Sequence, residues 1–273
     1  MRIALAQTTT GIDPVESVDA LARLIAEAAA GGAKMLFTPE MSGVLDRDRS
    51  RAAANIVTED EDRVLRAVCF AAAEAGIWVH LGSLALREGE RLVNRGFVID
   101  AKGAVRASYD KIHLFDVDLP DGTRWRESAS YSGGDRAVAA DTPAGRLGLS
   151  ICYDLRFPDL YRALTDAGAR ILSIPAAFTR PTGAAHWHIL MRARAIEAGV
   201  FVVAAAQTGT HADGRETYGH SLVVDPWGEV LLDMGEEAGL GFCDLALERV
   251  EEVRGRLPAI NHRRPIAAPE VVA

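Results

Sequence analysis

The chain has only three cysteines among its 273 residues, Cys69, Cys152 and Cys243. Because they are odd in number and widely spaced, we expect no framework of disulfide bonds and a reducing compartment, the cytoplasm. The sequence also lacks an apolar run of the about 18 residues that span a bilayer. Its first apolar segment is too short for the hydrophobic region of a secretory signal. We therefore expect a cytoplasmic protein without a membrane anchor.

Blocks of basic residues are missing as well. The net charge is −8, and no run of Lys or Arg stands out. A nucleic-acid groove or an anionic membrane surface needs such a run, so neither is expected as a partner. The glycine-rich patterns that bind nucleotides and the GxSxG elbow of serine hydrolases are also missing. A small molecule, which a few local arginines can bind if it is anionic, remains as the expected partner.

The histidines show no pattern that indicates a metal site. His186 and His188 lie two residues apart in a segment predicted to be helical, so they point to different faces and cannot share one ion. Chelating spacing is also missing for His113, His211, His220 and His262. We expect no metal cofactor.

The residues that are present indicate a layered α/β protein. Hydrophobic residues make up 49% of the chain and charged residues 25%, as in ordinary globular proteins. Helix-like and strand-like segments alternate almost throughout. Two neighbouring strands at 77–86 and 92–100 form a predicted hairpin, whereas other strands connect through helices. This mixture favours helices outside two packed sheets over one doubly wound parallel sheet.

One domain, residues 1–257, is expected, followed by an extended tail at 258–273 that contains three prolines. The polar stretch 116–135 is predicted to be a long loop. A Thr-x-x-Glu capping box at 58–61 predicts the start of a helix, and another helix is predicted over 183–199.

Cys152 lies at the end of an apolar strand in "SICYDLRFPD" and precedes a predicted helix at Pro158. Reactive groups of α/β proteins often occupy such strand-to-loop junctions. A free thiol with a pKa of about 8.5 needs a nearby base or cation to act as a nucleophile. The alternative is that Cys152 is a small buried packing residue, which is the interpretation that we prefer for Cys69 and Cys243.

Three charged residues could assist such a thiol. Glu40 directly follows the buried strand "KMLFTP", Lys111 lies in "SYDKIHLFD" and Glu127 in "WRESASYSGG". When their segments are considered alone, Lys111 and Glu127 are better explained as ordinary surface residues, and Glu40 could equally be a solvated or helix-capping residue.

Taken together, these segments resemble the carbon–nitrogen hydrolases of the nitrilase superfamily. The motifs "FTPE", "YDKIHLFD", "ESASYSGG" and "SICYDLRFPDLYR" occur in the family's order, and "AAHWHILMRARAIE" with "AAAQTGTH" is similar to its Nit amidase branch. The resemblance extends from residue 2 to about residue 257. It implies a four-layer α-β-β-α sandwich and a Glu–Lys–Cys catalytic group without metal or organic cofactor.

The resemblance also implies a role for each residue. Cys152 would be the nucleophile, Glu40 the general base and Lys111 the cation that stabilises the oxyanion. Glu127 would position the lysine, and the backbone N–H of Tyr153 would be a second oxyanion donor.

For the substrate, the resemblance implies a terminal amide of a small carboxylic acid, more similar to deaminated glutathione than to the α-ketoglutaramate of ω-amidases. Anionic groups favour arginine as a partner, so we expect Arg180 and Thr182 to bind the substrate and Phe178 to line the pocket. The alternatives are an ω-amidase, a nitrilase that uses the same thiol on a C≡N carbon, and a non-catalytic scaffold. A homodimer or higher homo-oligomer is expected from the family.

Overall fold

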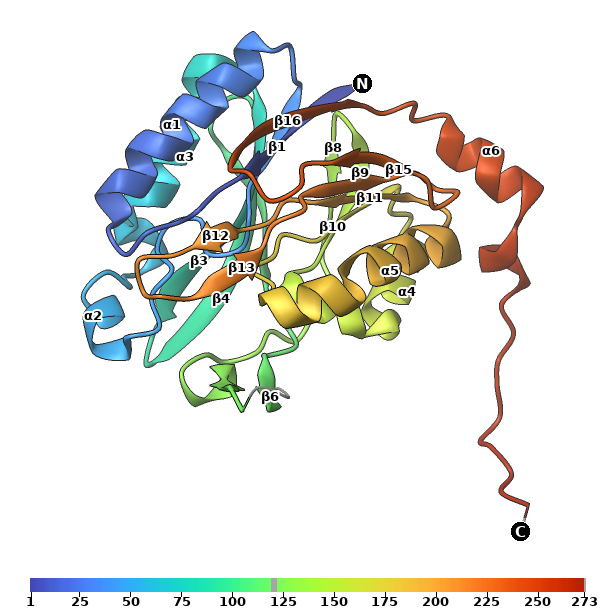
Figure 1. The fold of residues 1–273 in the computed structure, drawn as a ribbon. Helices are drawn as coiled ribbons and strands as arrows, with labels where there is room; N and C mark the ends of the chain where they lie inside the picture. The colour runs from blue at the N-terminus through green and yellow to red at the C-terminus, as the bar shows by residue number, and fades with distance from the viewer. Residues whose placement is uncertain (119–121, 273) are drawn as a thin grey trace.

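A computed structural model describes residues 1–118 and 122–272 and shows two packed β-sheets between layers of helices (Figure 1). The first sheet has the strand order β16-β1-β2-β3-β4-β5. Its strands are β1 Arg2–Gln7, β2 Met35–Phe37, β3 Trp78–Glu88, β4 Arg91–Ile99, β5 Val105–Asp110 and β16 Gly239–Asp244. Strands β1, β2 and β3 are parallel, whereas β3, β4 and β5 form the antiparallel part that includes the predicted hairpin.

The second sheet repeats this plan in the order β15-β14-β11-β10-β9-β8. Its strands are β8 Ala139–Thr142, β9 Gly145–Leu149, β10 Ile171–Ser173, β11 Phe201–Ala204, β14 Leu222–Val224 and β15 Val230–Asp233. Strands β9, β10 and β11 are parallel and occupy the centre of the sheet. Two short hairpins lie outside the sheets, formed by β6 Asp116–Asp118 with β7 Arg124–Arg126 and by β12 Thr208–Thr210 with β13 Glu216–Tyr218.

Helices cover the outer faces of both sheets. Helices α1 Pro14–Ala30 and α3 Arg63–Ala75 pack on the first sheet, and α4 Pro158–Asp166 and α5 Arg180–Ala198 pack on the second (Figure 1). The remaining helices are α2 Arg49–Ala53 and α6 Arg249–Arg256, with 3₁₀ turns η1 Glu59–Glu61, η2 Glu127–Ala129, η3 Cys152–Arg156 and η4 Ala259–His262. The predicted four-layer α-β-β-α sandwich is confirmed.

Strand β1 shows why both faces of a sheet are apolar here. Ile3 and Leu5 point into the core between the sheets, whereas Ala4 and Ala6 belong to the second core, beneath α1 and α3. Because side chains alternate along a strand, a strand between two apolar layers needs hydrophobic residues at every position.

The structure corrects three local predictions. The capping box of Thr58 and Glu61 caps the 3₁₀ turn η1, and α3 begins only at Arg63, with Asp62 as its cap. The stretch 116–135 is not a plain loop, because β6, β7 and η2 lie within it; its residues 119–121 are outside the described residues. Helix α5 begins at Arg180 and not at residue 183, with Pro181 in its first turn, where proline is favoured.

The C-terminal segment leaves the sandwich after α6. Residues 263–272 have no secondary structure and extend away from the body in Figure 1. The domain boundary at residue 257 stays a prediction. Among the described residues, no helix combines the length and the apolar character that crossing a membrane requires.

Candidate active site

The chain segments that follow three strands bring the predicted catalytic residues together. Glu40 lies three residues after β2, Lys111 directly follows β5, and Cys152 lies three residues after β9. The first two come from one sheet and the third from the other, so the site lies where the two sheets face each other. All three side chains line one cavity.

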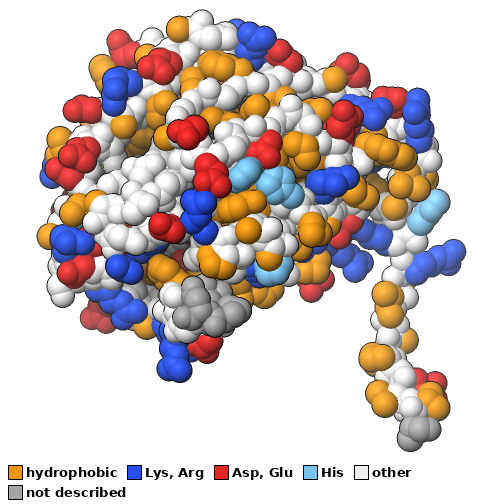
Figure 2. Space-filling model, viewed as in Figure 1, with side chains coloured by type: hydrophobic (Ala, Val, Ile, Leu, Met, Phe, Trp, Pro, Cys, Tyr) orange, Lys and Arg blue, Asp and Glu red, His pale blue; other side chains and the backbone are white. Residues whose placement is uncertain are grey.

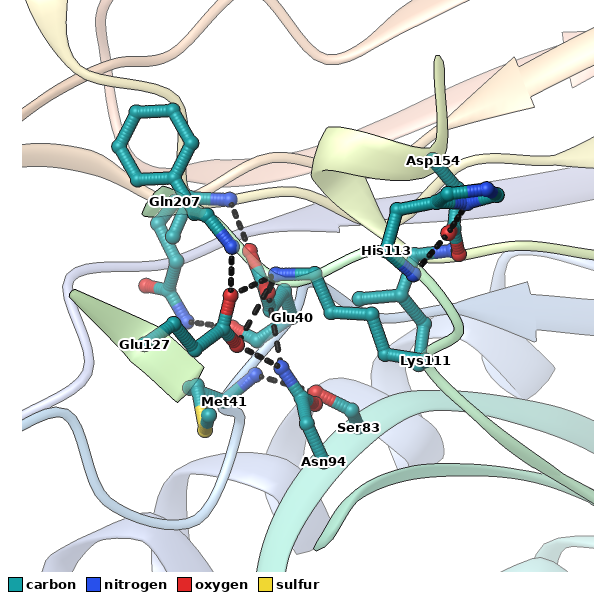
Figure 3. Close-up of polar contacts among 12 residues, drawn as sticks. Glu40, Met41, Ser83, Asn94, Lys111, His113, Glu127, Asp154 and Gln207 are labelled. Carbon is teal, nitrogen blue, oxygen red and sulfur yellow. Dashed lines mark hydrogen bonds and ion pairs between the residues drawn. The ribbon is translucent and has the colours of Figure 1, made fainter. Parts of the chain in front are cut away.

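Lys111 lies between two carboxylates (Figure 3). Its Nζ donates to Oε1 of Glu40 at 2.9 Å and to both oxygens of Glu127 at 3.1 and 2.9 Å. The second oxygen of Glu40 accepts from the backbone N–H of Ala177 at 2.9 Å, and Glu127 Oε2 accepts from the N–H of Phe115 at 2.6 Å. Both carboxylates are therefore held by several donors, which fixes the ammonium between them.

Asn94 on β4 is a member of this group that the sequence reasoning missed. Its Nδ2 donates to Glu40 at 2.9 Å and to Glu127 at 3.3 Å, and its backbone carbonyl accepts from Lys111 N at 2.9 Å. An asparagine inside the apolar strand segment "LVNRGFVID" was the available signal, because a buried amide needs polar partners.

Cys152 begins the 3₁₀ turn η3 in a strained conformation. Its φ is +51°, in the left-handed region that non-glycine residues rarely occupy, and its N–H donates to Pro175 at 2.8 Å. Such strain costs on the order of 1–3 kcal/mol and persists where the surrounding structure enforces it, often at functional sites. Met41, directly after Glu40, also has a positive φ, +56°.

Asp154 holds the cysteine turn against the lysine segment and was also missed. Its buried carboxylate accepts from Tyr109 Oη at 2.8 Å, from the N–H of His113 at 3.0 Å and from the N–H of Ile151 at 2.9 Å. His113 Nδ1 lies 2.7 Å from it as well (Figure 3). Tyr109 and His113 lie on either side of Lys111 in the sequence, and Ile151 directly precedes Cys152. Because it bonds to all three, Asp154 sets the distance between the segment of Lys111 and the segment of Cys152.

The charges of the site favour a neutral thiol beside an ionised carboxylate. Burial opposes ionisation of Glu40, but the charge of Lys111 and hydrogen bonds from Cys152, Lys111 and Asn94 outweigh it and lower its pKa. Burial and the nearby charge of Glu40 raise the pKa of the Cys152 thiol well above its ordinary value, although Lys111 opposes this. The pKa of Lys111 is raised because its two carboxylates outweigh burial. The geometry therefore suits transfer of the thiol proton to Glu40 once a substrate is bound.

These directions predict the pH profile of any reaction that needs Glu40 as a base. A carboxylate with a lowered pKa keeps its charge until the pH falls through that lowered value, so the acid limb of kcat/KM should lie below 4.5, the ordinary glutamate value. Amide hydrolysis measured from about pH 4 to pH 9, with circular dichroism to verify folding, tests this. An acid limb near neutrality would contradict it.

The cavity has a volume of about 390 Å³, enough for a small-molecule substrate. Its lining includes most of the predicted site: Glu40, Lys111, Glu127, Cys152, Tyr153, Phe178 and Thr182. Arg180 is not among the described residues that line it. Since the helix begins earlier than predicted, Arg180 lies in the first turn of α5, half-exposed, and donates to Glu236 at 2.9 Å.

A different arginine lies at the cavity. Arg215 lines it, its side chain is 16% exposed, and its guanidinium lies 4.9 Å from the centre of the Trp125 ring. One amino group pairs with Asp213 at 3.2 Å, whereas the buried Nε has no partner among the described residues. The sequence carried only a weak signal for Arg215, which lies in the polar loop "HADGRETYGH".

The other two cysteines fit the packing interpretation. All three cysteines are free thiols, and Cys243 is buried in the core between the sheets. Cys69 is half-buried beside the core beneath α3.

A family model and known proteins match most of the chain. A family model described as "Carbon-nitrogen hydrolase" matches residues 2–255. The "Deaminated glutathione amidase" of Homo sapiens is 39% identical over 269 residues, which cover 96% of this chain and 82% of that protein. The protein of the same name from Yersinia enterocolitica is 43% identical over 197 residues, which cover 71% of this chain and 69% of that protein.

Solved structures show the same fold. The C. elegans NitFhit protein has a TM-score of 0.89 at 38% identity. The match covers 96% of this chain and 65% of the NitFhit chain, which is longer. An amidase from Nesterenkonia sp. has a TM-score of 0.80 at 31% identity and covers 94% of this chain and 95% of its own. A further structure is a glutamate-to-glutamine variant of the Nesterenkonia amidase with acrylamide added at its active-site cysteine. It has 31% identity and a TM-score of 0.79, and the match covers 94% of this chain and 98% of that one.

Proposed function

The chain belongs to the carbon–nitrogen hydrolase family and is an amidase, and from that premise we propose that it hydrolyses the terminal amide of a small carboxylate-bearing substrate. The observation that carries the proposal is the meeting of Cys152, Glu40 and Lys111 at one cavity of substrate size. Deaminated glutathione is the substrate type that we favour, because the relatives at about 40% identity carry that name.

The proposed first half of the reaction forms a thioester. The substrate carbonyl carbon lies beside the sulfur of Cys152, and Glu40 takes the thiol proton as the S–C bond forms. The oxyanion that develops is stabilised by Lys111 and by the N–H of Tyr153 in the first turn of η3, where helical N–H groups lack partners within the turn. Glu40 then gives the proton to the departing nitrogen, and the C–N bond breaks to release ammonia.

The second half releases the acid. Glu40 takes a proton from a water molecule, and the water oxygen attacks the thioester carbon. The C–S bond then breaks, and Glu40 returns the proton to the sulfur of Cys152 to restore the thiol. The lysine supplies positive charge at the oxyanion in both halves. Since the resting thiol is neutral, charge on sulfur and oxygen develops only when a carbonyl is present to accept the attack, which protects the thiol from other reactions.

We propose that Arg215 binds the substrate carboxylate in place of Arg180. Arg215 lines the cavity and its side chain is mostly buried, so an anionic substrate group in the cavity would lie near its positive charge with little screening by water. The ring of Trp125 beneath it holds the guanidinium in place. Thr182 and Phe178 line the same cavity and complete the proposed substrate contacts.

Arg215→Met is expected to raise KM about 10- to 100-fold for amides that carry a carboxylate and to change KM little for neutral amides, since a hydrogen bond to a charged group contributes about 1.5–3 kcal/mol. Steady-state kinetics on a matched pair, a carboxylate amide and its methyl ester, measure this. Arg180→Met, which removes an arginine outside the cavity lining, is the matched control and should leave both KM values near the wild type. Equal effects of Arg215→Met on the two substrates would refute the assignment.

A substrate panel separates the proposed amidase from its alternatives. We expect the highest kcat/KM for deaminated glutathione, a lower value for α-ketoglutaramate and little turnover of nitriles, read by ammonia release and product mass. A preference for α-ketoglutaramate would indicate an ω-amidase, and preferential nitrile turnover would indicate a nitrilase. No turnover together with an unreactive Cys152 would favour a scaffold protein.

We also propose that the chain forms a homodimer or higher homo-oligomer. Exposed apolar side chains on α5 and the neighbouring turn support this: Ile189 is 70% exposed, Ile196 46% and Trp227 56%. Contact between copies would remove this apolar surface from water.

Location in the cytoplasm remains part of the proposal and is supported by the three free thiols.

A further inference from the structure

A second group of chemically active side chains lies away from the catalytic cavity. His188 on α5, His220 in the turn before β14 and Asp233 at the end of β15 each bring one ligand atom within 4.8 Å of the others. None of the three is among the described residues that line the cavity. In Figure 2, histidine and acidic side chains lie side by side on the face that carries α5 in Figure 1.

The geometry of the group is close to that of a three-ligand metal site. Nε2 of His188 lies 2.9 Å from one oxygen of Asp233, and Nδ1 of His220 lies 2.8 Å from the other. The ligand atoms of a tetrahedral zinc site are about 3.3–3.5 Å apart, so each His–Asp pair would need to open by about half an ångström to admit an ion. All three ligand atoms lie within 4.8 Å of one another. The side chains of His188, His220 and Asp233 are 34%, 21% and 32% exposed, respectively, so water can reach the site and act as a fourth ligand.

The ligands are held in place by their surroundings. The ring of Tyr218 stacks on His220 at 4.5 Å and meets His188 edge-on at 6.2 Å. Backbone groups of His220 bond to Trp187 Nε1 at 2.8 Å and to the carbonyl of Gly235 at 2.6 Å. Asp233 accepts from the N–H of Gly235 at 2.9 Å. Such supporting contacts orient metal ligands and reduce the ordering that binding requires.

The backbone at His220 is strained in the same way as that at the active site. In the described part of the chain, the non-glycine residues with positive φ are Met41, Cys152 and His220, the last at +54°. Of these, Cys152 is the predicted nucleophile and Met41 directly follows Glu40. Strain of this kind is retained where a side chain must be aimed in a particular direction, and here it directs the His220 imidazole toward Asp233.

We propose that His188, His220 and Asp233 bind a divalent transition-metal ion of the zinc type, outside the catalytic cavity. Two imidazoles and one carboxylate suit zinc, whereas magnesium and calcium take mainly oxygen ligands. The ion connects α5 to β15 and to the turn before β14, so it fixes the helix whose first turn carries Thr182 at the cavity. Spacing along the chain does not reveal this site, because its ligands come from three separate elements.

The competing explanation is that Asp233 only accepts hydrogen bonds from the two histidines. It predicts no specific metal binding. Both explanations predict that the group stabilises the contact between α5 and β15, so stability alone does not separate them, and metal affinity must be measured.

The test uses the full chain with Cys152→Ala, so that the catalytic thiol cannot bind the metal. Zinc added to protein stripped with a chelator should bind with one ion per chain in calorimetry, and cobalt should give the visible absorption of a tetrahedral site. In this background His188→Ala should weaken binding at least about tenfold. His186→Ala is the matched control, because His186 lies two residues away on α5 and contacts Arg156.

Asp233→Asn, which keeps the shape of the side chain, should also weaken zinc binding and abolish the zinc-dependent rise in Tm. Circular dichroism verifies that each variant is folded. Absence of saturable zinc binding in the folded Cys152→Ala protein would overturn the proposal. So would equal zinc affinity in the His188→Ala and His186→Ala variants.

Discussion

Cys152→Ala is expected to lower kcat for amide hydrolysis at least about 10⁴-fold while the protein stays folded, because the thioester route loses its only nucleophile. Cys152 lines the cavity and bonds to Glu40, and the described residues that line the cavity include no other cysteine. Alanine fits the space that the thiol leaves, and it tolerates the positive φ about as well as cysteine does. Ammonia release and circular dichroism measure the two parts of the prediction.

Cys243→Ala is the matched control for this variant. Cys243 is also a free, buried cysteine, 8% exposed against 7% for Cys152, but it packs in β16 away from the cavity. If Cys243 is only a packing residue, the Cys243→Ala variant should keep kcat within about twofold of the wild type, even if its stability falls modestly. Substantial ammonia release by the Cys152→Ala variant would contradict the nucleophile assignment.

Lys111→Met is expected to lower kcat/KM by about 10³-fold or more and to reduce stability. The loss of one oxyanion donor costs about 10²–10³ in rate. The two carboxylates that Lys111 holds, Glu40 and Glu127, would also be left facing each other in a buried site, and breaking such a pair costs about 3–5 kcal/mol. Without the ammonium the pKa of Glu40 should rise, so a smaller fraction would act as a base at neutral pH.

The double variant Lys111→Met with Glu127→Gln separates the two effects. Removing the charge of Glu127 relieves the repulsion, so the Tm should recover toward that of the wild type, whereas the rate should stay low because no cation is restored. Recovery of kcat in the double variant would show that Lys111 acts only through stability. Lys102→Met, at an exposed turn, is the control for the loss of a lysine and should change neither property.

The positions of Glu40 and Cys152 could be predicted from local patterns because each follows a strand that is apolar in sequence. Lys111 follows the mostly polar strand β5, so its proposed role came from the resemblance to the family. Glu40 and Lys111 follow strands of the first sheet that run in the same direction, so both reach the same end of that sheet. Cys152 follows a strand of the second sheet. The pairing of the two sheets followed from the mixture of hairpins and helical connections. These features depend on local patterns, which a single sequence records well.

The residues that were missed act across long distances in the chain. Asp154 bonds to Tyr109 and His113, which precede it by 45 and 41 residues, and no local pattern marks such a contact. Arg180 lies outside the described cavity lining for a local reason, since the helix begins at Arg180, with Pro181 in its first turn, and Arg180 reaches Glu236. Arg215 lies at the cavity because it stacks on Trp125, 90 residues away in sequence, which only the fold shows.

The central claim is that one carbonyl carbon meets the thiol of Cys152, the carboxylate of Glu40 and the ammonium of Lys111 at the same time. Intact-protein mass spectrometry after acid quench of the enzyme turning over a carboxylate amide tests it most directly. The account predicts an adduct equal to the substrate minus ammonia, located on the peptide that contains Cys152 and missing from the Cys152→Ala variant. Rapid turnover with no acyl adduct at Cys152, even with hydroxylamine added to capture one, would contradict it.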